Sequence, residues 1–261
     1  MCATCGCGQG AGEREHEHAQ EHEPEHAHAQ EHEHPHSHDH HHEHETVRLE
    51  REVLARNDRL AERNRGWFAA REVLALNLVS SPGAGKTTLL ERTIREAGAE
   101  LRIHVIEGDQ ETSADADRIR AAGARAVQIN TGTGCHLDAE MISRALGELQ
   151  APAQSTVMIE NVGNLVCPAL FDLGERAKVV IASVTEGDDK PLKYPHMFRA
   201  GAVLLLNKVD LLAHVPFDPD RFVANARLVN PRLTIFRVSA TRGDGLSGWY
   251  GWLKDQHQRA A

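Results

Sequence analysis

Cysteine and histidine side chains give this chain of 261 residues several groups that can bind a metal ion. Cys2, Cys5 and Cys7 lie close together, separated by small residues, so their thiolates can surround one soft or borderline ion. If Met1 is removed, the α-amino group beside Cys2 can act as a fourth ligand. A disulfide would leave one thiol over, and half of a four-cysteine zinc site would need a second cysteine pair. We therefore expect a tight, nearly self-contained metal site at these three cysteines.

Histidine and glutamate dominate the segment that follows. Of the 18 histidines in the chain, 13 lie between His16 and His44, and many alternate with glutamate. Neutral imidazole is a good ligand for nickel, copper, zinc and cobalt, and the interleaved carboxylates attract cations. Residues 1–45 contain almost no large apolar side chains, so we expect a disordered metal-binding tail. A solubilising segment or an expression tag is the alternative, although tags are usually uniform histidine runs.

A second set of metal-binding residues lies in the body of the chain. Its two cysteines are Cys135, which is followed directly by His136, and Cys167. These residues supply at most three ligands, and an adjacent Cys-His pair is too cramped to close a tetrahedral zinc site by itself. A site shared between two chains would supply the missing ligands. The alternative is a pair of buried free thiols, which are common in proteins.

The elements that must position these groups alternate between strands and helices from about residue 71. Val73–Val79 is an apolar run of strand length, and Leu89–Ala97 has helical spacing. The turn between them contains Gly83, Ala84, Gly85, Lys86, Thr87 and Thr88. Backbone N–H groups in such a P-loop bind phosphates, the lysine reaches the outer phosphates, and the first threonine ligates Mg²⁺. Ser80 stands where the motif usually has its first glycine, and Gly83 can supply that flexibility instead.

The pattern divides the chain into the tail at residues 1–45, a charged helical linker at residues 46–70, and a nucleotide-binding domain at residues 71–261. For this domain we expect an α/β fold with a mostly parallel sheet flanked by helices. The net charge is −9, and the tail alone carries −10, so the body is nearly neutral. It has no basic field for nucleic acid or anionic lipid. No apolar run is long enough to cross a membrane, and no signal-peptide pattern begins the chain, so we expect a cytoplasmic protein without membrane insertion.

The segment Asn207-Lys208-Val-Asp210 follows a buried apolar run and resembles the guanine-specificity motif of GTPases. The aspartate carboxylate accepts from the guanine ring N–H and amine, which adenine cannot present as a pair. Ser239 and Ala240 follow another apolar run and resemble the last GTPase motif, whose backbone contacts the guanine oxygen. Together with the P-loop, these motifs favour GTP over ATP and argue against a small-molecule kinase.

Two further apolar runs end in acidic residues. The first runs from Arg102 into Glu-Gly-Asp109, and the second runs from Thr156 into Glu160, which Gly163 follows. Carboxylates at strand ends beside a P-loop can hold Mg²⁺ directly or through water. We therefore predict Asp109 as a magnesium-linked switch residue, Glu160 as a second acid, and the Gly163 N–H as a sensor of the γ-phosphate. The alternative is that either acid caps a following helix.

These motifs recur in the order of one family, and together they resemble the nickel-incorporation GTPases of nickel–iron hydrogenase maturation, the HypB family. The segments are Cys-x-x-Cys-Gly-Cys, the His-rich tract, the P-loop, Glu-Gly-Asp-Gln, Gly-Cys-His-Leu-Asp-Ala, Glu-Asn-Val-Gly-Asn-Leu-Val-Cys-Pro, Glu-Gly-Asp-Asp-Lys-Pro-Leu-Lys-Tyr-Pro and Asn-Lys-Val-Asp. They cover residues 2–7 and about 71–250. Ser80 and Glu160 depart from general GTPases but not from this family.

The resemblance implies a GTPase that forms a homodimer favoured by GTP. It implies that Cys2, Cys5 and Cys7 bind nickel, and that Cys135, His136 and Cys167 bind zinc or nickel at a dimer interface. It further implies two partners, a small zinc-containing nickel chaperone and the hydrogenase large-subunit precursor. Lys190 and Lys193 match a stretch that lies near the nucleotide across the dimer. The equally weighted alternative is that both are solvated surface lysines with no role in the site.

The sequence therefore predicts a slow GTPase switch that uses GTP and Mg²⁺ to deliver nickel. No residue is an evident arginine finger, and GTPases without one turn over slowly. A urease-type nickel GTPase is the nearest alternative, but that family has Cys-Pro-His where this chain has Gly134-Cys135-His136, and it lacks the N-terminal three-cysteine motif. A nickel storage protein, in which the GTPase domain is incidental, is the alternative of another class.

Overall fold

The computed structural model describes residues 40–109, 114–132 and 134–260, with side chains from residue 47 onward. The predicted site at Cys2, Cys5 and Cys7 and most of the expected tail lie outside these residues. The chain divides into two compact units, Met1–Val53 and Leu54–Ala261. Helix α1 (His40–Ala70) passes through the boundary. It contains the expected helical linker and begins earlier, within the segment expected to be disordered.

Seven strands of the described chain form one parallel sheet in the order β3-β2-β4-β1-β5-β6-β7. They are β1 (Leu74–Ser80), β2 (Ile103–Asp109), β3 (Arg125–Asn130), β4 (Thr156–Glu160), β5 (Ala177–Ser183), β6 (Gly201–Asn207) and β7 (Thr234–Arg237). Helical crossovers connect parallel neighbours, as such sheets require. The alternating pattern of the sequence therefore predicted the fold class correctly.

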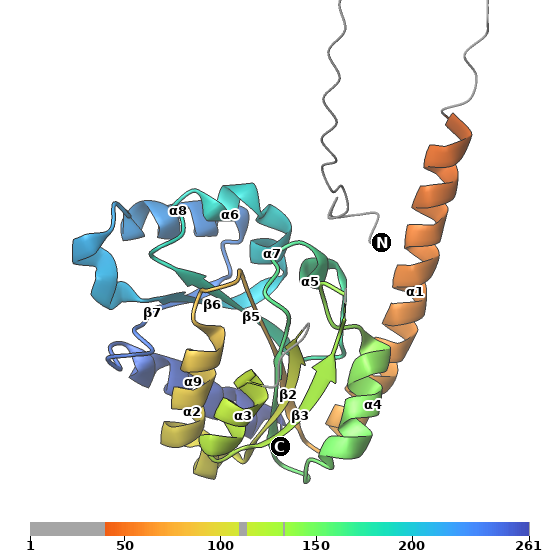
Figure 1. Ribbon diagram of the computed structural model, residues 1–261, viewed down its shortest axis with the longest axis horizontal. Helices are drawn as coiled ribbons and strands as arrows, with labels where there is room; N and C mark the ends of the chain where they lie inside the picture. The colour runs from red at the N-terminus through yellow and green to blue at the C-terminus, as the bar shows by residue number, and fades with distance from the viewer. Residues whose placement is uncertain (1–39, 110–113, 133, 261) are drawn as a thin grey trace, which may run out of the picture. The chain divides into compact units, whose positions relative to one another are not determined.

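Helices cover both faces of the sheet (Figure 1). Besides α1 they are α2 (Lys86–Leu101), α3 (Ala114–Ala121), α4 (Ala139–Leu149), α5 (Cys167–Leu170), α6 (Lys190–Lys193), α7 (Pro195–Ala200), α8 (Pro219–Val229) and α9 (Leu246–Ala260), with a 3₁₀ turn η1 (Val209–His214). On one face α2, α3 and α9 enclose an apolar core. On the other face two further cores form, one under the end of α1 and α4 and one under α7 and α8.

The central strands show why the sheet needs cover on both sides. Every residue of β1 is buried, with Leu74, Leu76 and Leu78 facing the core of α2 and α9. Ala75 faces the opposite core beneath α4. Such continuous apolar burial is typical of parallel strands. At the carboxyl ends of β1, β2, β4 and β6 polar residues, most of them still buried, replace the apolar ones, and ligands of open α/β sheets bind at that edge.

Two buried asparagines attach the second half of α1 to this domain. Asn57 accepts a hydrogen bond from Ala139 N at 2.9 Å and donates to the Asp172 carbonyl at 2.8 Å. Asn64 donates to the carbonyls of Ala139 at 2.8 Å and Leu173 at 3.1 Å. The amide side chains thereby satisfy backbone groups that would otherwise be buried without partners.

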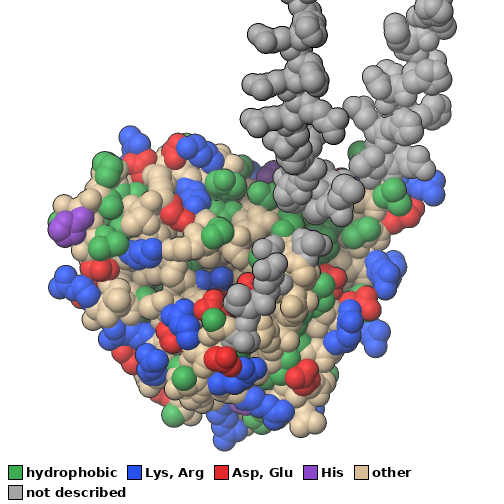
Figure 2. Space-filling view, in the orientation of Figure 1, with side chains coloured by type: hydrophobic (Ala, Val, Ile, Leu, Met, Phe, Trp, Pro, Cys, Tyr) green, Lys and Arg blue, Asp and Glu red, His purple; other side chains and the backbone are tan. Residues whose placement is uncertain are grey.

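Charged side chains of both signs are interspersed on the face of the molecule shown in Figure 2. This mixture agrees with the nearly neutral charge of the chain outside its first 45 residues. Among the described residues, no helix has the length and apolar character needed to cross a membrane.

Candidate nucleotide and metal site

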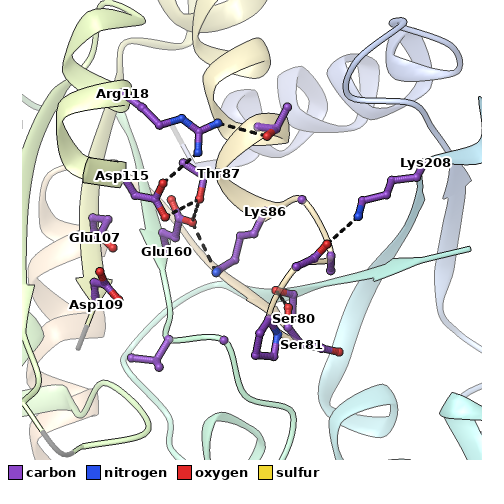
Figure 3. Close-up of a pocket in the computed structure, with 18 residues that line it drawn as sticks. Ser80, Ser81, Lys86, Thr87, Glu107, Asp109, Asp115, Arg118, Glu160 and Lys208 are labelled. Atoms are coloured by element: carbon purple, nitrogen blue, oxygen red, sulfur yellow. Dashed lines mark hydrogen bonds and ion pairs between the residues drawn. The ribbon is translucent and has the colours of Figure 1, made fainter. Parts of the chain in front are cut away.

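A cavity of about 570 Å³ opens at the carboxyl edge of the sheet. Its lining comes from the P-loop and its flanks (Ser80–Thr88), the end of β2 (Glu107–Asp109), the first turns of α3 (Asp115 and Arg118), the end of β4 (Glu160, Val162 and Gly163) and Lys208. Figure 3 shows the carboxylates of Glu107, Asp109, Asp115 and Glu160 together on one side, with Ser80, Ser81 and Lys208 on the other. The cavity therefore brings a phosphate-binding turn against a group of acids.

The turn between β1 and α2 has the backbone conformation of a phosphate-binding loop. Gly83 and Gly85 have φ angles of 74° and 92°, in the left-handed region that favours glycine. A Cβ atom at Gly85 would also lie 2.6 Å from Asn207 Nδ2, so this position has no room for a side chain. Ser80 ends β1 in a buried position, and its hydroxyl donates to the Ser81 carbonyl at 2.7 Å. The left-handed residues of the turn are therefore Gly83 and Gly85.

Lys86 and Thr87 both contact Glu160 at the end of β4. The Thr87 hydroxyl lies 2.7 Å from Glu160 Oε1, and Lys86 Nζ lies 3.4 Å from the same oxygen. Burial raises the pKa of Glu160, while Lys86 and Thr87 oppose that shift. Glu160 Oε2 is buried without a hydrogen-bond partner among the described residues. The structure thus brings together the predicted Lys86, Thr87 and Glu160.

Three charged residues that line the cavity were not among the predicted site residues, namely Glu107, Asp115 and Arg118. Asp115 Oδ2 lies 3.0 Å from the Thr87 hydroxyl. Arg118 donates to Asp115 Oδ1 at 2.9 Å and to the Thr88 hydroxyl at 3.2 Å. No strand-end signal marks Asp115 and Arg118 in the sequence, because both lie on α3. Their role becomes visible only in the folded chain.

Glu107 could have been found from strand periodicity. Side chains two apart on a strand share a face, so Glu107 points to the same side as Asp109. Glu107 is 2% exposed, and burial, reinforced by Glu160 and Asp109, raises its pKa to about 8. Its Oε2 atom is also buried without a partner in the described chain. The Thr87 hydroxyl and the Asp115 and Glu160 carboxylates that it contacts form the oxygen-rich set that Mg²⁺ prefers, so the residues of this cavity fit the ion.

Asn207 joins the predicted base-binding segments to the P-loop. Its Nδ2 atom donates to the Ala84 carbonyl at 3.0 Å, and its Oδ1 atom accepts from Ala240 N at 3.0 Å. Lys208 Nζ donates to the Gly83 carbonyl at 2.7 Å. Asp210 Oδ1 is buried and finds no hydrogen-bond partner in the described part of the chain, which suits a carboxylate that awaits the donors of a base.

Ser239 is fully buried, and its hydroxyl accepts from Arg242 N at 3.0 Å. This hydrogen bond shapes the loop that follows β7 and presents Ala240 to Asn207. Asn207 and Lys208 therefore contact the P-loop, and Ala240 contacts Asn207.

The structure brings together Cys135, His136 and Cys167. The two sulfur atoms are 3.2 Å apart, and Cys135 Sγ lies 3.7 Å from His136 Nδ1. One ligand atom from each residue lies within 4.8 Å of the others, which is close enough for a single ion. Burial lowers the pKa of His136, which favours the neutral imidazole that metals bind. Three ligands still leave a tetrahedral ion one short, as the spacing predicted.

The two lysines of the segment after β5 differ in their surroundings. Lys190 Nζ donates to the Ser81 hydroxyl beside the P-loop and pairs with Glu186 at 2.9 Å. Lys193 lies on the surface, where it pairs with Asp189 at 2.8 Å. Only the first of these two lysines therefore reaches the P-loop of its own chain.

Comparison with known proteins gives the same family from sequence and structure. Residues 74–237 match the model of the CobW/HypB/UreG nucleotide-binding domain. The hydrogenase maturation factor HypB of Escherichia coli K12 is 57% identical over 210 residues, which are 80% of this chain and 72% of that protein.

Comparison with solved structures points to the same family as the sequence comparison. HypB from Archaeoglobus fulgidus aligns with a TM-score of 0.73 and 42% identity, covering 78% of this chain and 99% of that one. HypB from Helicobacter pylori, solved in complex with nickel, aligns with a TM-score of 0.73 and 35% identity, covering 78% and 96%. With more than half of its length matched by the domain model and this level of identity, the chain belongs to the HypB family of hydrogenase maturation factors, within the CobW/HypB/UreG nucleotide-binding domains.

Proposed function

We propose that this protein is a GTP-hydrolysing nickel metallochaperone that delivers nickel to the precursor of the hydrogenase large subunit. The observation that carries the proposal is the short path between two sites. Gly163 lines the nucleotide cavity, and Cys167, four residues later, lies 3.2 Å from Cys135 Sγ. A nucleotide that moves Gly163 therefore acts on a metal ligand.

In the proposed reaction, the P-loop backbone and Lys86 bind the phosphates of GTP, and Lys86 then exchanges its contact with Glu160 for one with phosphate. Thr87 and Asp109 hold Mg²⁺, which neutralises charge on the phosphates when bound. Glu160 orients the Thr87 hydroxyl, and the Gly163 N–H contacts the γ-phosphate. The P-loop segment Gly83–Thr88 completes the phosphate site.

Guanine is selected at the other end of the cavity. Asp210 accepts from the ring N–H and the amine, while Asn207, Lys208, Ser239 and Ala240 hold the surrounding loops. The unpartnered Asp210 Oδ1 atom supports this assignment, because a buried carboxylate oxygen needs a donor.

Hydrolysis in this scheme is slow. The arginine that lines the cavity is Arg118, and its guanidinium is held by Asp115 at 2.9 Å and by Glu91 at 2.8 Å. We infer that an arginine engaged in this way is not a finger on the γ-phosphate, and GTPases without one turn over slowly. A slow cycle suits a switch that alternates between two metal-binding states.

Nickel is the cargo. Cys2, Cys5 and Cys7 hold it tightly, the His-rich tail gathers it, and Cys135, His136 and Cys167 take up nickel or zinc. A homodimer favoured by GTP would supply the ligands that one chain lacks. The nickel complex of the Helicobacter pylori relative supports this cargo. The partners in the cytoplasm are a small zinc-containing nickel chaperone and the hydrogenase large-subunit precursor.

The test is cellular. The gene is disrupted, and hydrogenase and urease activities are measured at low nickel and with excess nickel. Hydrogenase activity lost at low nickel and partly restored by excess supports delivery to hydrogenase. Loss of urease activity alone would transfer the assignment to the urease-type function. Survival of both activities at low nickel would favour storage and overturn the delivery mechanism.

A further inference from the structure

Leu137, the residue that follows His136, contacts both acidic strand ends of the nucleotide cavity. Its backbone N–H donates to Asn161 Oδ1 at 3.2 Å. Its fully buried side chain packs on Gly108, where a Cβ atom would lie 2.8 Å from the Leu137 side chain. The backbone of the Cys-His segment is therefore held between the ends of β2 and β4.

These two strand ends also line the nucleotide cavity. Gly108 lies between Glu107 and Asp109, and all three line the cavity. Asn161 directly follows Glu160, whose carboxylate contacts Thr87 and Lys86. A rearrangement of acids around Mg²⁺ and phosphate therefore reaches Leu137 from two sides.

A second asparagine attaches the same segment from the other side of Gly163. Asn164 Nδ2 donates to the Cys135 carbonyl at 3.3 Å, and its Oδ1 accepts from Val166 N at 2.8 Å. Gly163 packs so closely on Pro82 of the P-loop that a Cβ atom there would lie 3.2 Å from it. Asn161 and Asn164, which flank the cavity residues Val162 and Gly163, thus bind the backbone on both sides of His136.

Asn161 is rigidly held. It is 1% exposed, and its Oδ1 atom also accepts from Val162 N at 3.0 Å. Its Nδ2 donates to Asn77 Oδ1 at 3.2 Å, and its backbone N–H donates to the Leu78 carbonyl at 3.0 Å. A buried side chain whose oxygen and amide nitrogen are both hydrogen-bonded moves together with its backbone, so it transmits a displacement rather than absorbing it.

We propose that Asn161 and Asn164 are positioning residues that transmit nucleotide state to Cys135 and His136. The inference rests on the proposed function, in which nucleotide changes metal affinity. Cys167 is joined covalently to the Gly163 segment, whereas the backbone on either side of His136 is hydrogen-bonded to that segment through these two side chains. The other contacts, between the two sulfur atoms and between the rings of His136 and Phe171, are made by the ligand side chains themselves. Without the two asparagines, the backbone that carries Cys135 and His136 would lose these hydrogen bonds to the Gly163 segment.

The test measures coupling between the two ligands in the full chain. Cys2, Cys5 and Cys7 are replaced by Ser, which leaves Cys135 and Cys167 as the thiols, so thiolate-to-nickel absorption reports the body site alone. Chelator-buffered Ni²⁺ is titrated into the protein twice, once in the presence of GDP and once in the presence of a non-hydrolysable GTP analogue. The ratio of the two nickel Kd values is the coupling factor, and linkage requires nickel to change the nucleotide Kd ratio equally.

The parent is the variant in which Cys2, Cys5 and Cys7 are replaced by Ser. In this parent we expect a coupling factor of roughly fivefold or more, within the usual range for linked sites. Asn161→Ala and Asn164→Asp should each reduce it at least about threefold. Asn164→Asp keeps the oxygen that accepts from Val166 N but removes the donor to the Cys135 carbonyl. It therefore breaks the connection and keeps the turn. Circular dichroism shows whether Asn161→Ala folds. If it does not, the coupling factor of Asn164→Asp alone tests the proposal.

The matched control is Asn230→Ala. The Asn230 side chain bonds the carbonyls of Phe198, Arg199 and Gly201 and lines neither site, so the coupling factor should not change. If the coupling factor of Asn164→Asp equals that of the parent, the role of the asparagines is overturned while the proposed switching stands. A parent without any nucleotide dependence would overturn the proposed switching, and this inference with it.

Discussion

The hydroxyl of Thr87 lies 3.0 Å from the carboxylate of Asp115, although 28 positions separate the two residues in the chain. Asp115 lies in the first turn of α3, and Arg118 holds its other oxygen at 2.9 Å. The same hydroxyl lies 2.7 Å from Glu160. Asp115 therefore belongs to the group of oxygens around Thr87 that a hard cation would use.

Replacing Asp115 by Asn should weaken Mg²⁺ binding, because the site loses a charge next to the Thr87 hydroxyl. We expect the Mg²⁺ concentration for half-maximal GTP hydrolysis to rise by about tenfold or more, which corresponds to about 1.4 kcal/mol. Asp117→Asn on the same helix is the control, since Asp117 pairs with Arg120 on the surface. If both variants need the same Mg²⁺ concentration for half-maximal hydrolysis, Asp115 is excluded and Asp109 remains as the candidate ligand.

Lys86→Ala should abolish GTP hydrolysis, because it removes the ammonium group that pairs with the phosphates in the proposed site. The measurement is phosphate release at saturating GTP. Lys254→Ala is the control, since Lys254 forms only a surface ion pair with Glu100 at 2.7 Å. Turnover like that of the unmodified protein in Lys86→Ala would refute the P-loop assignment.

Asp210→Asn should shift the base preference from guanine toward xanthine. In the proposed site the carboxylate accepts two hydrogen bonds from guanine, and hydrogen bonds to charged groups contribute about 1.5–3 kcal/mol each. We expect GTP affinity to fall at least about tenfold while affinity for xanthosine triphosphate rises. Competition binding measures both. Asp220→Asn, which affects an exposed pair with Arg237, should keep the guanine preference; a preference unchanged in Asp210→Asn would exclude base recognition by this residue.

Glu107 should make the stability of the Mg²⁺-free and nucleotide-free protein depend on pH. Burial raises its pKa from the ordinary 4.5 to about 8, so between these values the folded state holds a proton that the unfolded state has lost. The free energy of unfolding contributed by this group is present below the unfolded pKa and is lost as pH rises through about 8. Stability should therefore fall with rising pH in this window.

Thermal unfolding between about pH 5 and pH 9, on either side of the raised pKa, measures this dependence. Glu107→Gln cannot ionise, so its Tm should fall less steeply than that of the unmodified protein. Glu148→Gln, at an exposed position of α4, should keep the original slope. Parallel slopes for Glu107→Gln and the unmodified protein would show that Glu107 is already ionised.

Cys167→Ser and His136→Ala should each weaken nickel binding at the body site while GTP binding is retained. Each variant removes one of three ligand atoms that lie within 4.8 Å of one another. Thiolate-to-nickel absorption in the background lacking Cys2, Cys5 and Cys7 measures the change. His214→Ala, at an exposed position of η1, is the control, and binding unaffected in Cys167→Ser would exclude that thiol as a ligand.

The sequence by itself was sufficient for the parts of the protein that depend on short segments. The phosphate-binding turn at Gly83–Thr88 and the base motif at Asn207–Asp210 are continuous in the chain, and their residue types follow from backbone conformation and hydrogen-bonding chemistry. The apolar runs that predicted strands were continuous and of strand length, as is typical of parallel strands covered on both faces. The α/β fold class and the HypB family followed from these local signals, and both are confirmed.

Only the tertiary structure decided which distant residues meet. Asp115 reaches Thr87 because α3 packs beside α2, and Cys135 reaches Cys167 because the loops after β3 and β4 lie at the same edge of the sheet. The strand order β3-β2-β4-β1-β5-β6-β7 determines those neighbours. Such contacts depend on how whole elements pack, since the free energy that chooses one arrangement is spread over many buried side chains.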